Sequence, residues 1–337
     1  MTDIAKQILD MGHTPVSYSA LKEFRKGGIH RYYRYKEREL DEVSTPSTDL
    51  GSLIDLYLLD KEKFESDYLL DTTSAPGSDN QLNFASLIAL EGLSREEAYK
   101  RSYKNPPKTE SKLKEKANDL YEDLKEYIEF LPNTQGKLTY NNDVSFGLNQ
   151  IRMNIMGHKF LSTLFDWING NCPDHIEVLT HVPLQADFMG IPMRGELDIV
   201  IMDHRNKTLI VYDLKSTNYH LTNFGWQVKS LDYVLQAAIY GILAKQAMLS
   251  EGYSFQFPRL IAVRTTGGYD AGVFDIPPAW LRQEINKLKS DLEEIKWHYE
   301  TKQFKYPRAY YEGDGVLELE YIKDMDLWKQ EIEQSVS

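Results

Sequence analysis

The clearest pattern of apolar and polar positions lies in the middle of the chain. The apolar run Val200-Ile201-Met202 is followed by the polar stretch Asp203-His204-Arg205-Asn206-Lys207, and Thr208-Leu209-Ile210-Val211-Tyr212 is apolar and β-branched again. Two such runs separated by turn-forming residues are typical of a β-hairpin. The pattern therefore predicts two neighbouring antiparallel strands.

A buried helix is predicted shortly after this hairpin. Residues Leu231 to Gln246 carry apolar side chains on nearly every face of a helix, which is typical of a helix inside a core. Gln236 and Tyr240 lie within it, and because they are four residues apart they share one face. A buried polar side chain needs a partner or a function. The pair is therefore either a satisfied core pair or part of a site.

Acidic and basic residues frame the predicted hairpin. Gly195-Glu196-Leu197-Asp198 precedes it, and Asp213-Leu214-Lys215 follows on the second strand. Side chains alternate along a strand, so Asp213 and Lys215 share a face while Leu214 points away. Two carboxylates and an amine then converge. Carboxylate oxygens suit Mg²⁺, and a nearby lysine can orient a water molecule; a solvated strand pair with a salt bridge would explain the same residues.

These residues together resemble the PD-(D/E)xK nuclease superfamily. Asp198 corresponds to the first acid, and Asp213-Leu214-Lys215 corresponds to the D-x-K motif. The Q-x-x-x-Y motif of Gln236 and Tyr240, about twenty residues later, is similar to the helix motif of the RecB-like branch. The combination is much more specific than either part, and it implies a restriction-endonuclease-like core.

The resemblance extends over most of residues 17 to 245. Glu177 opens a strand-like run that looks like the glutamate strand of the family, and a G-x-x-D strand follows. Near the start, Tyr18 to Phe24 and Thr45 to Phe64 are similar to the opening of RecE-type phage and prophage exonucleases. There the family pattern carries a histidine metal ligand, where this chain has Asp55. Aspartate is a good ligand for hard cations, so Asp55 either binds the metal with a stronger preference for Mg²⁺ or is a surface carboxylate at a site that has lost a ligand.

Composition agrees with one soluble, elaborated domain. The chain has 337 residues, 42% of them hydrophobic, without a long Gly/Ser linker, an internal repeat or a predicted signal peptide. Cys172 is the only cysteine, which excludes an intramolecular disulfide and favours a cytoplasmic location; the resemblance implies that this is in a bacterial cell or a phage-infected host. We expect one nuclease domain over 1–337: a mainly helical part (1–170) that forms one wall of a cleft, a catalytic core (177–246), and a part (247–337) with strands and an amphipathic helix over Ala279 to Thr301.

The net charge of −12 argues against a protein that coats nucleic acid indiscriminately, although local basic segments remain. Between Arg95 and Lys116 basic residues outnumber acids, and a second basic and aromatic segment runs from Arg25 to Arg38. Such segments are either solvated faces or phosphate contacts. The candidate DNA-binding residues are Arg31, Arg34, Lys100, Arg101, Lys104 and Arg194. Zinc-ligand spacing and a phosphate-binding glycine loop are absent from the sequence, so we expect no zinc site and no nucleotide cofactor.

The sequence thus predicts an α/β protein with a mixed central sheet flanked by helices. The resemblance implies a Mg²⁺-dependent deoxyribonuclease, with Mn²⁺ as a substitute, that resects linear duplex ends for recombination. In that reading the metal ligands are Asp198, Asp213, Asp55 and the Leu214 carbonyl, with Glu177 as an additional carboxylate. Lys215 aligns the attacking water, and Gln236 and Tyr240 brace the site or touch the scissile strand. The resemblance also implies a ring-like homo-oligomer and a partner that anneals single strands. We expect no membrane association, because the longest apolar run, around Leu235 to Ala244, is too short to span a bilayer.

Two other functions fit the same residues. The first is an endonuclease or a nuclease of a defence system, because the same core serves many nucleases. The second is a DNA-binding or assembly protein that keeps the fold with a weakened metal site, which Asp55 and the acidic net charge favour.

Overall fold

The protein contains two sheets. The structure, a computed structural model, describes residues 3–40, 45–74, 76–249 and 252–316. In these ranges the strands form one six-stranded and one two-stranded sheet. The strands are β1 (Tyr68–Asp71), β2 (Leu138–Asn141), β3 (Ile176–Phe188), β4 (Ile191–Asp203), β5 (Thr208–Thr217), β6 (Ser254–Phe255), β7 (Arg259–Arg264) and β8 (Ala271–Asp275).

Helices occupy most of the rest of the described chain. The α-helices are α1 (Asp3–Asp10), α2 (Tyr18–Lys36), α3 (Pro46–Leu59), α4 (Lys61–Asp67), α5 (Asp79–Ala89), α6 (Arg95–Ser102), α7 (Glu110–Phe130), α8 (Asn142–Gly157), α9 (Lys159–Ile168), α10 (Phe224–Ser230), α11 (Tyr233–Ala247), α12 (Pro278–Thr301) and α13 (Arg308–Glu312). Two short 3₁₀ turns are η1 (Leu131–Thr134) and η2 (Leu221–Asn223). In the described ranges, no helix combines the length and the apolar character that a membrane crossing requires.

The large sheet is mixed, as predicted. Its strand order is β3-β4-β5-β7-β8, with β6 paired to β5. Strands β3, β4 and β5 are antiparallel, whereas β5 pairs with β7 in parallel through a crossover that includes α10 and α11. The predicted hairpin over residues 200–212 is confirmed as β4 and β5, and a turn that contains Gly267 and Gly268 joins the antiparallel strands β7 and β8.

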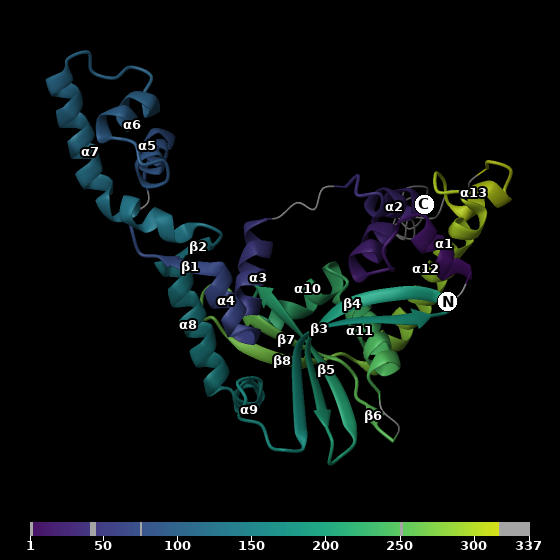
Figure 1. Cartoon of the computed structure of the whole chain (residues 1–337). Coiled ribbons are helices and arrows are strands. Elements are labelled where there is room, and N and C mark those ends of the chain that lie inside the picture. The colour runs from purple at the N-terminus through teal and green to yellow at the C-terminus, as the bar shows by residue number, and fades with distance from the viewer. Residues whose placement is uncertain (1–2, 41–44, 75, 250–251, 317–337) are drawn as a thin grey trace, which may run out of the picture.

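Helices cover both faces of this sheet (Figure 1). Because side chains alternate along a strand, β4 sends Val200 to one face and Ile199 to the other. Val200 packs in a core with α2, α11 and α12. Ile199 packs in a second core with α3, α8 and α9. The fold is therefore a layered α/β architecture with a core on each side of the strands that carry the acids and the lysine.

Helices α5, α6 and α7 form a separate unit that projects from the sheet (Figure 1). They share their own core, which is centred on Phe84, Leu124 and Ile128. The parallel pair of β1 and β2 lies at the base of this projection. The first 170 residues therefore divide between two places, because α2 and α3 lie beside the sheet while α5 to α7 stand away from it. The single domain over 1–337 stays a prediction, and residues 317–337 lie outside the described ranges.

The predicted buried helix is α11, which begins two residues later than expected, at Tyr233. Nine of its residues are buried, Gln236 and Tyr240 among them. This helix lies close against β4 at Gly195, where an added Cβ would come within 2.9 Å of Leu243 Cδ1 and 3.0 Å of Tyr240 Cε1. The glycine of the G-x-x-D strand thus permits the close packing that places Tyr240 beside the acids. The amphipathic helix predicted over Ala279 to Thr301 is α12, which starts one residue earlier.

Replacing Gly195 by alanine is expected to destabilise the protein by about 1–3 kcal/mol, because an overpacked core must shift side chains or backbone. Urea unfolding of the metal-free protein measures this change. Gly225→Ala is the matched control, since Gly225 is exposed on α10 and an added Cβ there meets nothing within 4 Å. Equal stability of the two variants would contradict the assigned packing of α11 on β4.

Candidate functional site

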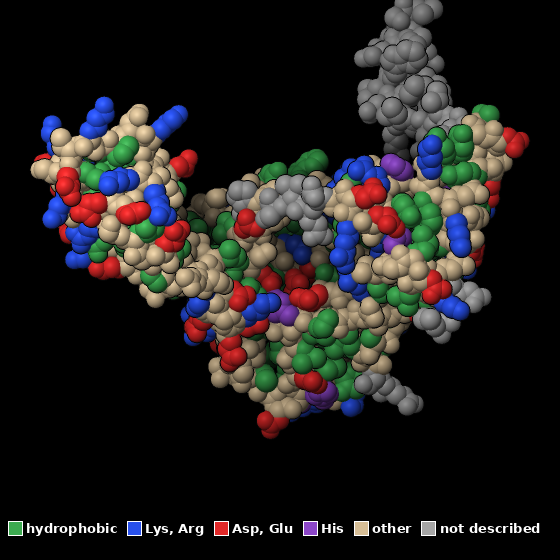
Figure 2. Space-filling model, turned by 45° about the horizontal axis from the view of Figure 1, so that its top comes forward, with side chains coloured by type: hydrophobic (Ala, Val, Ile, Leu, Met, Phe, Trp, Pro, Cys, Tyr) green, Lys and Arg blue, Asp and Glu red, His purple; other side chains and the backbone are tan. Residues whose placement is uncertain are grey.

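A deep cleft of about 1180 Å³ opens between α2, α3, α10, α11 and the strands β3 to β5. Its lining includes Tyr18 and Thr48 from the N-terminal helices, Arg194 from β4, and Gln236 and Tyr240 from α11. The space-filling view shows acidic side chains and a histidine at the floor of a hollow, with Lys and Arg side chains on its wall (Figure 2). The expected cleft wall from the N-terminal helices is thus formed by α2 and α3.

The two acids and the lysine of the D-x-K pattern meet beside this cleft. Lys215 Nζ donates a hydrogen bond of 2.7 Å to Oδ1 of Asp213. The Leu214 N–H donates a bond of 2.7 Å to Oδ2 of Asp198, which links β5 to β4. The ammonium of Lys215 also lies 5.2 Å from the ring centroid of Tyr233. The structure therefore brings Asp198, Asp213 and Lys215 together, and Leu214 packs into the core on the opposite face of β5.

Burial dominates the electrostatics of this group. The side chain of Asp213 is only 1% exposed, and burial raises its pKa to about 7, with Lys215 opposing the rise and Asp198 adding to it. Burial also raises the pKa of Asp198. For Lys215, burial disfavours the charge, but the carboxylates of Asp213 and Asp198 outweigh it and raise the pKa. The site thus holds a charged lysine beside two carboxyl groups that resist ionisation. A bound cation would stabilise their ionised form, so the site favours binding of a cation.

Gln236 and Tyr240 form a pair above these carboxyl groups. Gln236 Nε2 donates a hydrogen bond of 2.8 Å to the Tyr240 hydroxyl. Burial raises the pKa of Tyr240, and the negative charges of Asp213 and Asp198 raise it further. The tyrosine therefore stays a neutral hydroxyl next to the acids. Both side chains also line the cleft, so the polar pair of the buried helix belongs to the site.

Asp55 reaches the same site from α3. Burial raises its pKa, and its electrostatic neighbours include His181, Lys215 and Asp213. The Nε2 atom of His181 lies 3.5 Å from Oδ2 of Asp55, and its Nδ1 lies 3.5 Å from Oε1 of Glu196. Sequence reasoning missed His181. Its only signal is the pairing of β3 with β4, which sets His181 opposite Asp198 and is known only once the register is known.

Glu177 does not reach this site. Its carboxylate lies 3.0 Å from Nε2 of His204 at the far end of β3, four residues from His181 and therefore roughly 13 Å along the strand. The expectation that Glu177 adds a carboxylate to the metal site is corrected by this position. The β3 residues that line the cleft are Pro183, Leu184 and Gln185, in the second half of the strand, whereas Glu177 is its second residue.

The candidate DNA-binding residues lie in three places. Arg194 is exposed and lines the cleft. Arg31 is paired with Glu23, and Arg34 lies 3.2 Å from Glu39, both on the outside of α2. The third group is on or just after α6 in the projecting helical unit, where its side chains are exposed: Lys100, Arg101 and Lys104. Arg194 is therefore the candidate nearest to the acids.

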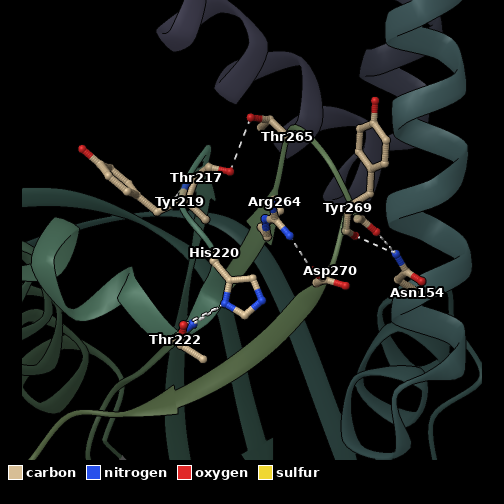
Figure 3. Close-up of polar contacts among 10 residues, drawn as sticks. Asn154, Thr217, Tyr219, His220, Thr222, Arg264, Thr265, Tyr269 and Asp270 are labelled. Carbon is tan, nitrogen blue, oxygen red and sulfur yellow. Dashed lines mark hydrogen bonds and ion pairs between the residues drawn. The ribbon is translucent and has the colours of Figure 1, made fainter.

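The end of strand β5 is fixed by the turn between β7 and β8 (Figure 3). The backbone N–H of Thr265 donates a bond of 2.8 Å to the Thr217 carbonyl. Arg264 forms an ion pair of 2.8 Å with Asp270 across the turn, and Asn154 of α8 donates to the carbonyl of Tyr269 at 2.9 Å. The bond from Thr265 thus anchors the end of the strand that carries Asp213 and Lys215 to this turn, and the other two contacts hold the turn together and tie it to α8.

The donor atoms at the site fit a divalent cation. Oδ2 of Asp213 is buried without a hydrogen-bond partner, although it lies as near to Lys215 Nζ as Oδ1 does. Nε2 of His181 is also buried and without a hydrogen-bond partner. Within residues 3–316 as described, no three His, Cys, Asp or Glu side chains already stand in a metal-binding arrangement. Carboxylate oxygens nevertheless provide the chemistry that Mg²⁺ requires. Nε2 of His181 is buried without a hydrogen-bond partner, and Oδ2 of Asp213 has only its ion pair with Lys215.

Comparisons with known proteins agree with this site. No curated protein matches the sequence. A solved structure of a "Putative exonuclease" from Eubacterium rectale is similar over 96% of this chain and 96% of its own, with 10% identity and a TM-score of 0.47. Residues 180–306 match a family model described as a "PDDEXK-like domain of unknown function". The matched region includes Asp198, Asp213, Lys215 and the Q-x-x-x-Y helix, so residues 180–306 form a PDDEXK-like domain, and the predicted resemblance to the PD-(D/E)xK superfamily is confirmed for this part of the chain.

Proposed function

We propose that this protein is a metal-dependent nuclease that hydrolyses phosphodiester bonds of DNA. One observation carries the proposal: two buried carboxyl groups and a lysine from adjacent strands meet beside a large cleft inside the PDDEXK-like domain. A polymer can enter a cleft of this size, and the negative floor calls for a cation between protein and phosphate. The Q-x-x-x-Y pair on its lining supports the same reading.

The residues have distinct roles in this proposal. Asp198 and Asp213 would hold Mg²⁺, joined by Asp55 and the Leu214 carbonyl, with Mn²⁺ as a substitute. When bound, the cation supplies positive charge that polarises the phosphoryl group and favours an ionised water. Lys215 aligns the attacking water and stabilises the negative charge that develops at phosphorus. Gln236 and Tyr240 present a hydrogen-bonded amide and hydroxyl to the scissile strand.

Arg194 is the proposed phosphate contact inside the cleft, because it lines the cleft and is exposed there. Lys100, Arg101 and Lys104 stand on the projecting unit, where they could meet only a longer stretch of DNA. Arg31 and Arg34 already have acidic partners, so their contribution to DNA binding would be smaller. Local positive charge of this kind suffices for phosphate binding despite the net charge of −12.

We further propose that the substrate is a linear duplex end, as in the RecE-type exonucleases that the chain resembles. A ring-like homo-oligomer, a single-strand annealing partner and a cytoplasmic setting in a bacterial cell or a phage-infected host belong to the same proposal. An exonuclease needs an end on which to load, whereas an endonuclease does not. The form of the DNA therefore separates the two activities.

The test compares end-labelled linear duplex DNA with closed circular DNA, each with Mg²⁺ or with EDTA. We expect Mg²⁺-dependent loss of the linear DNA only, and no loss with the Lys215→Ala variant. Cleavage of the circle would establish an endonuclease of the same fold. Failure of the wild type to cleave either DNA in Mg²⁺ or Mn²⁺ would contradict a deoxyribonuclease and favour a DNA-binding protein with a weakened metal site.

A further inference from the structure

Strand β3 changes its backbone conformation at His181. Its residues Thr180 and Val182 pair with Ile199 and Leu197 of β4, but the ladder is interrupted between them, where His181 stands opposite Asp198. The register is the same on both sides of the interruption, so no residue is inserted. His181 has a φ of +50°, in the left-handed region that few side chains adopt. Backbone strain of this kind persists where surrounding structure holds it, often at functional sites.

This conformation sets the imidazole between two carboxylates. Nε2 of His181 is 3.5 Å from Oδ2 of Asp55, and Nδ1 is 3.5 Å from Oε1 of Glu196. Nε2 is buried and makes no hydrogen bond, so this nitrogen is held toward Asp55 without being satisfied by it. Two atoms that bind one metal ion at about 2.1 Å lie roughly 3.0–3.4 Å apart. The separation of Nε2 and Oδ2 is close to this range.

A second unsatisfied atom belongs to the same group. Oδ2 of Asp213 is buried without a hydrogen-bond partner, on a side chain that is 1% exposed. Asp55 interacts electrostatically with both His181 and Asp213, so it lies near both side chains. Glu196 is 64% exposed and sits on the Nδ1 side of the ring. A histidine that binds metal through one nitrogen usually directs the other to a carboxylate, and Glu196 is placed for that role.

We propose that His181 is a nitrogen ligand of the catalytic cation, paired with Asp55 and oriented by Glu196. This inference rests on the proposed function and assigns a ligand that the D-x-K pattern does not contain. It also changes the expected metal preference. An all-oxygen site suits Mg²⁺, whereas an imidazole favours Mn²⁺ and other transition metals. The protein should therefore bind Mn²⁺ more tightly than Mg²⁺, in contrast to the preference expected from Asp55 alone.

The test uses the full-length, EDTA-treated protein with Mn²⁺ as the probe. Electron spin-echo envelope modulation detects a directly bound imidazole nitrogen, and calorimetry measures the affinity. His181→Asn is the variant of choice because asparagine tolerates a left-handed backbone. His204→Asn is the matched control, since His204 lies at the other end of the sheet, beside Glu177. Circular dichroism and thermal unfolding establish that both variants are folded.

We expect nitrogen modulation in the wild type and in His204→Asn, and its loss in His181→Asn together with about a tenfold or larger drop in Mn²⁺ affinity. Modulation that persists in His181→Asn would overturn the inference. The inference would also be overturned if the wild type bound Mn²⁺ without nitrogen modulation while Asp198→Ala failed to bind it. That result would show a metal site without a histidine ligand and would leave the proposed nuclease intact. No Mn²⁺ binding by the wild type would overturn both the inference and the metal assignment of the proposed function.

Discussion

Lys215→Ala is expected to lower the rate of DNA cleavage by about 10²- to 10³-fold, the usual cost of removing one group that stabilises transition-state charge. The ammonium of Lys215 is held by Asp213 at 2.7 Å, so it has a defined position next to the proposed cation. Its loss has a second consequence. Lys215 lowers the pKa of Asp213, so without it the carboxyl keeps its proton to a pH above 7.

The variant should therefore recover part of its cation binding when the pH is raised, while the cleavage rate stays low. Calorimetric Mg²⁺ titration at pH 7 and pH 9, beside single-turnover cleavage, separates the two effects. Lys245→Ala is the matched control, because Lys245 is an exposed lysine on α11. Cleavage by Lys215→Ala within a factor of ten of the wild type would remove Lys215 from the proposed chemistry.

The stability of the metal-free protein is expected to decline between about pH 4 and pH 7 because of Asp213. The folded carboxyl has a pKa of about 7 against an ordinary value of 3.8. As the pH rises, the carboxyl ionises in the unfolded chain at a lower pH than in the folded protein, which favours unfolding. The contribution of Asp213 to the free energy of unfolding is therefore complete below pH 3.8 and is lost by about pH 7. At 1.36 kcal/mol for each pH unit, the loss is on the order of 4 kcal/mol.

Urea unfolding in EDTA from pH 4 to pH 8 measures this decline, and Asp213→Asn should lack it. Only the pH slopes are compared, because the asparagine also leaves Lys215 without its closest counter-charge. Asp10→Asn, a change at an exposed residue of α1, is the control and should keep the wild-type slope. Added Mg²⁺ should restore stability to the wild type at pH 8 and not to Asp213→Asn. Parallel slopes in wild type and Asp213→Asn would contradict the assigned burial.

Local patterns predicted the elements that carry the D-x-K pair. The apolar runs around residues 200–212 became β4 and β5, because a period of two and a polar break are properties of neighbouring residues. The same holds for α11, whose continuous apolar surface predicted burial and whose Gln236 and Tyr240 face the site. The spacing of the motif then predicted that Asp198, Asp213 and Lys215 lie together, because the register of this one hairpin sets Asp198 next to Asp213.

The sequence did not predict which residues from distant parts of the chain lie beside the acids. Glu177 and His181 lie on one strand, and either could have faced the acids; only the pairing of β3 with β4 puts His181 there and leaves Glu177 beside His204. Likewise, the sequence left open whether the basic residues between Arg95 and Lys116 contact phosphate or form a solvated face. They lie on α6, on α7 and between these helices, in a unit with its own core that stands away from the cleft. Neither outcome follows from local periodicity.

The sequence by itself determined the mixed α/β core, the acid–lysine pattern and the buried helix above it, because each depends on side chains a few residues apart whose spacing is set by strand and helix geometry. The tertiary structure decided which distant elements meet that pattern. It brought Asp55 from α3 and His181 from β3 to the acids, and it left Oδ2 of Asp213 buried without a hydrogen-bond partner. These contacts depend on strand register and on the packing of helices across the sheet, which many side chains determine together and no single motif encodes.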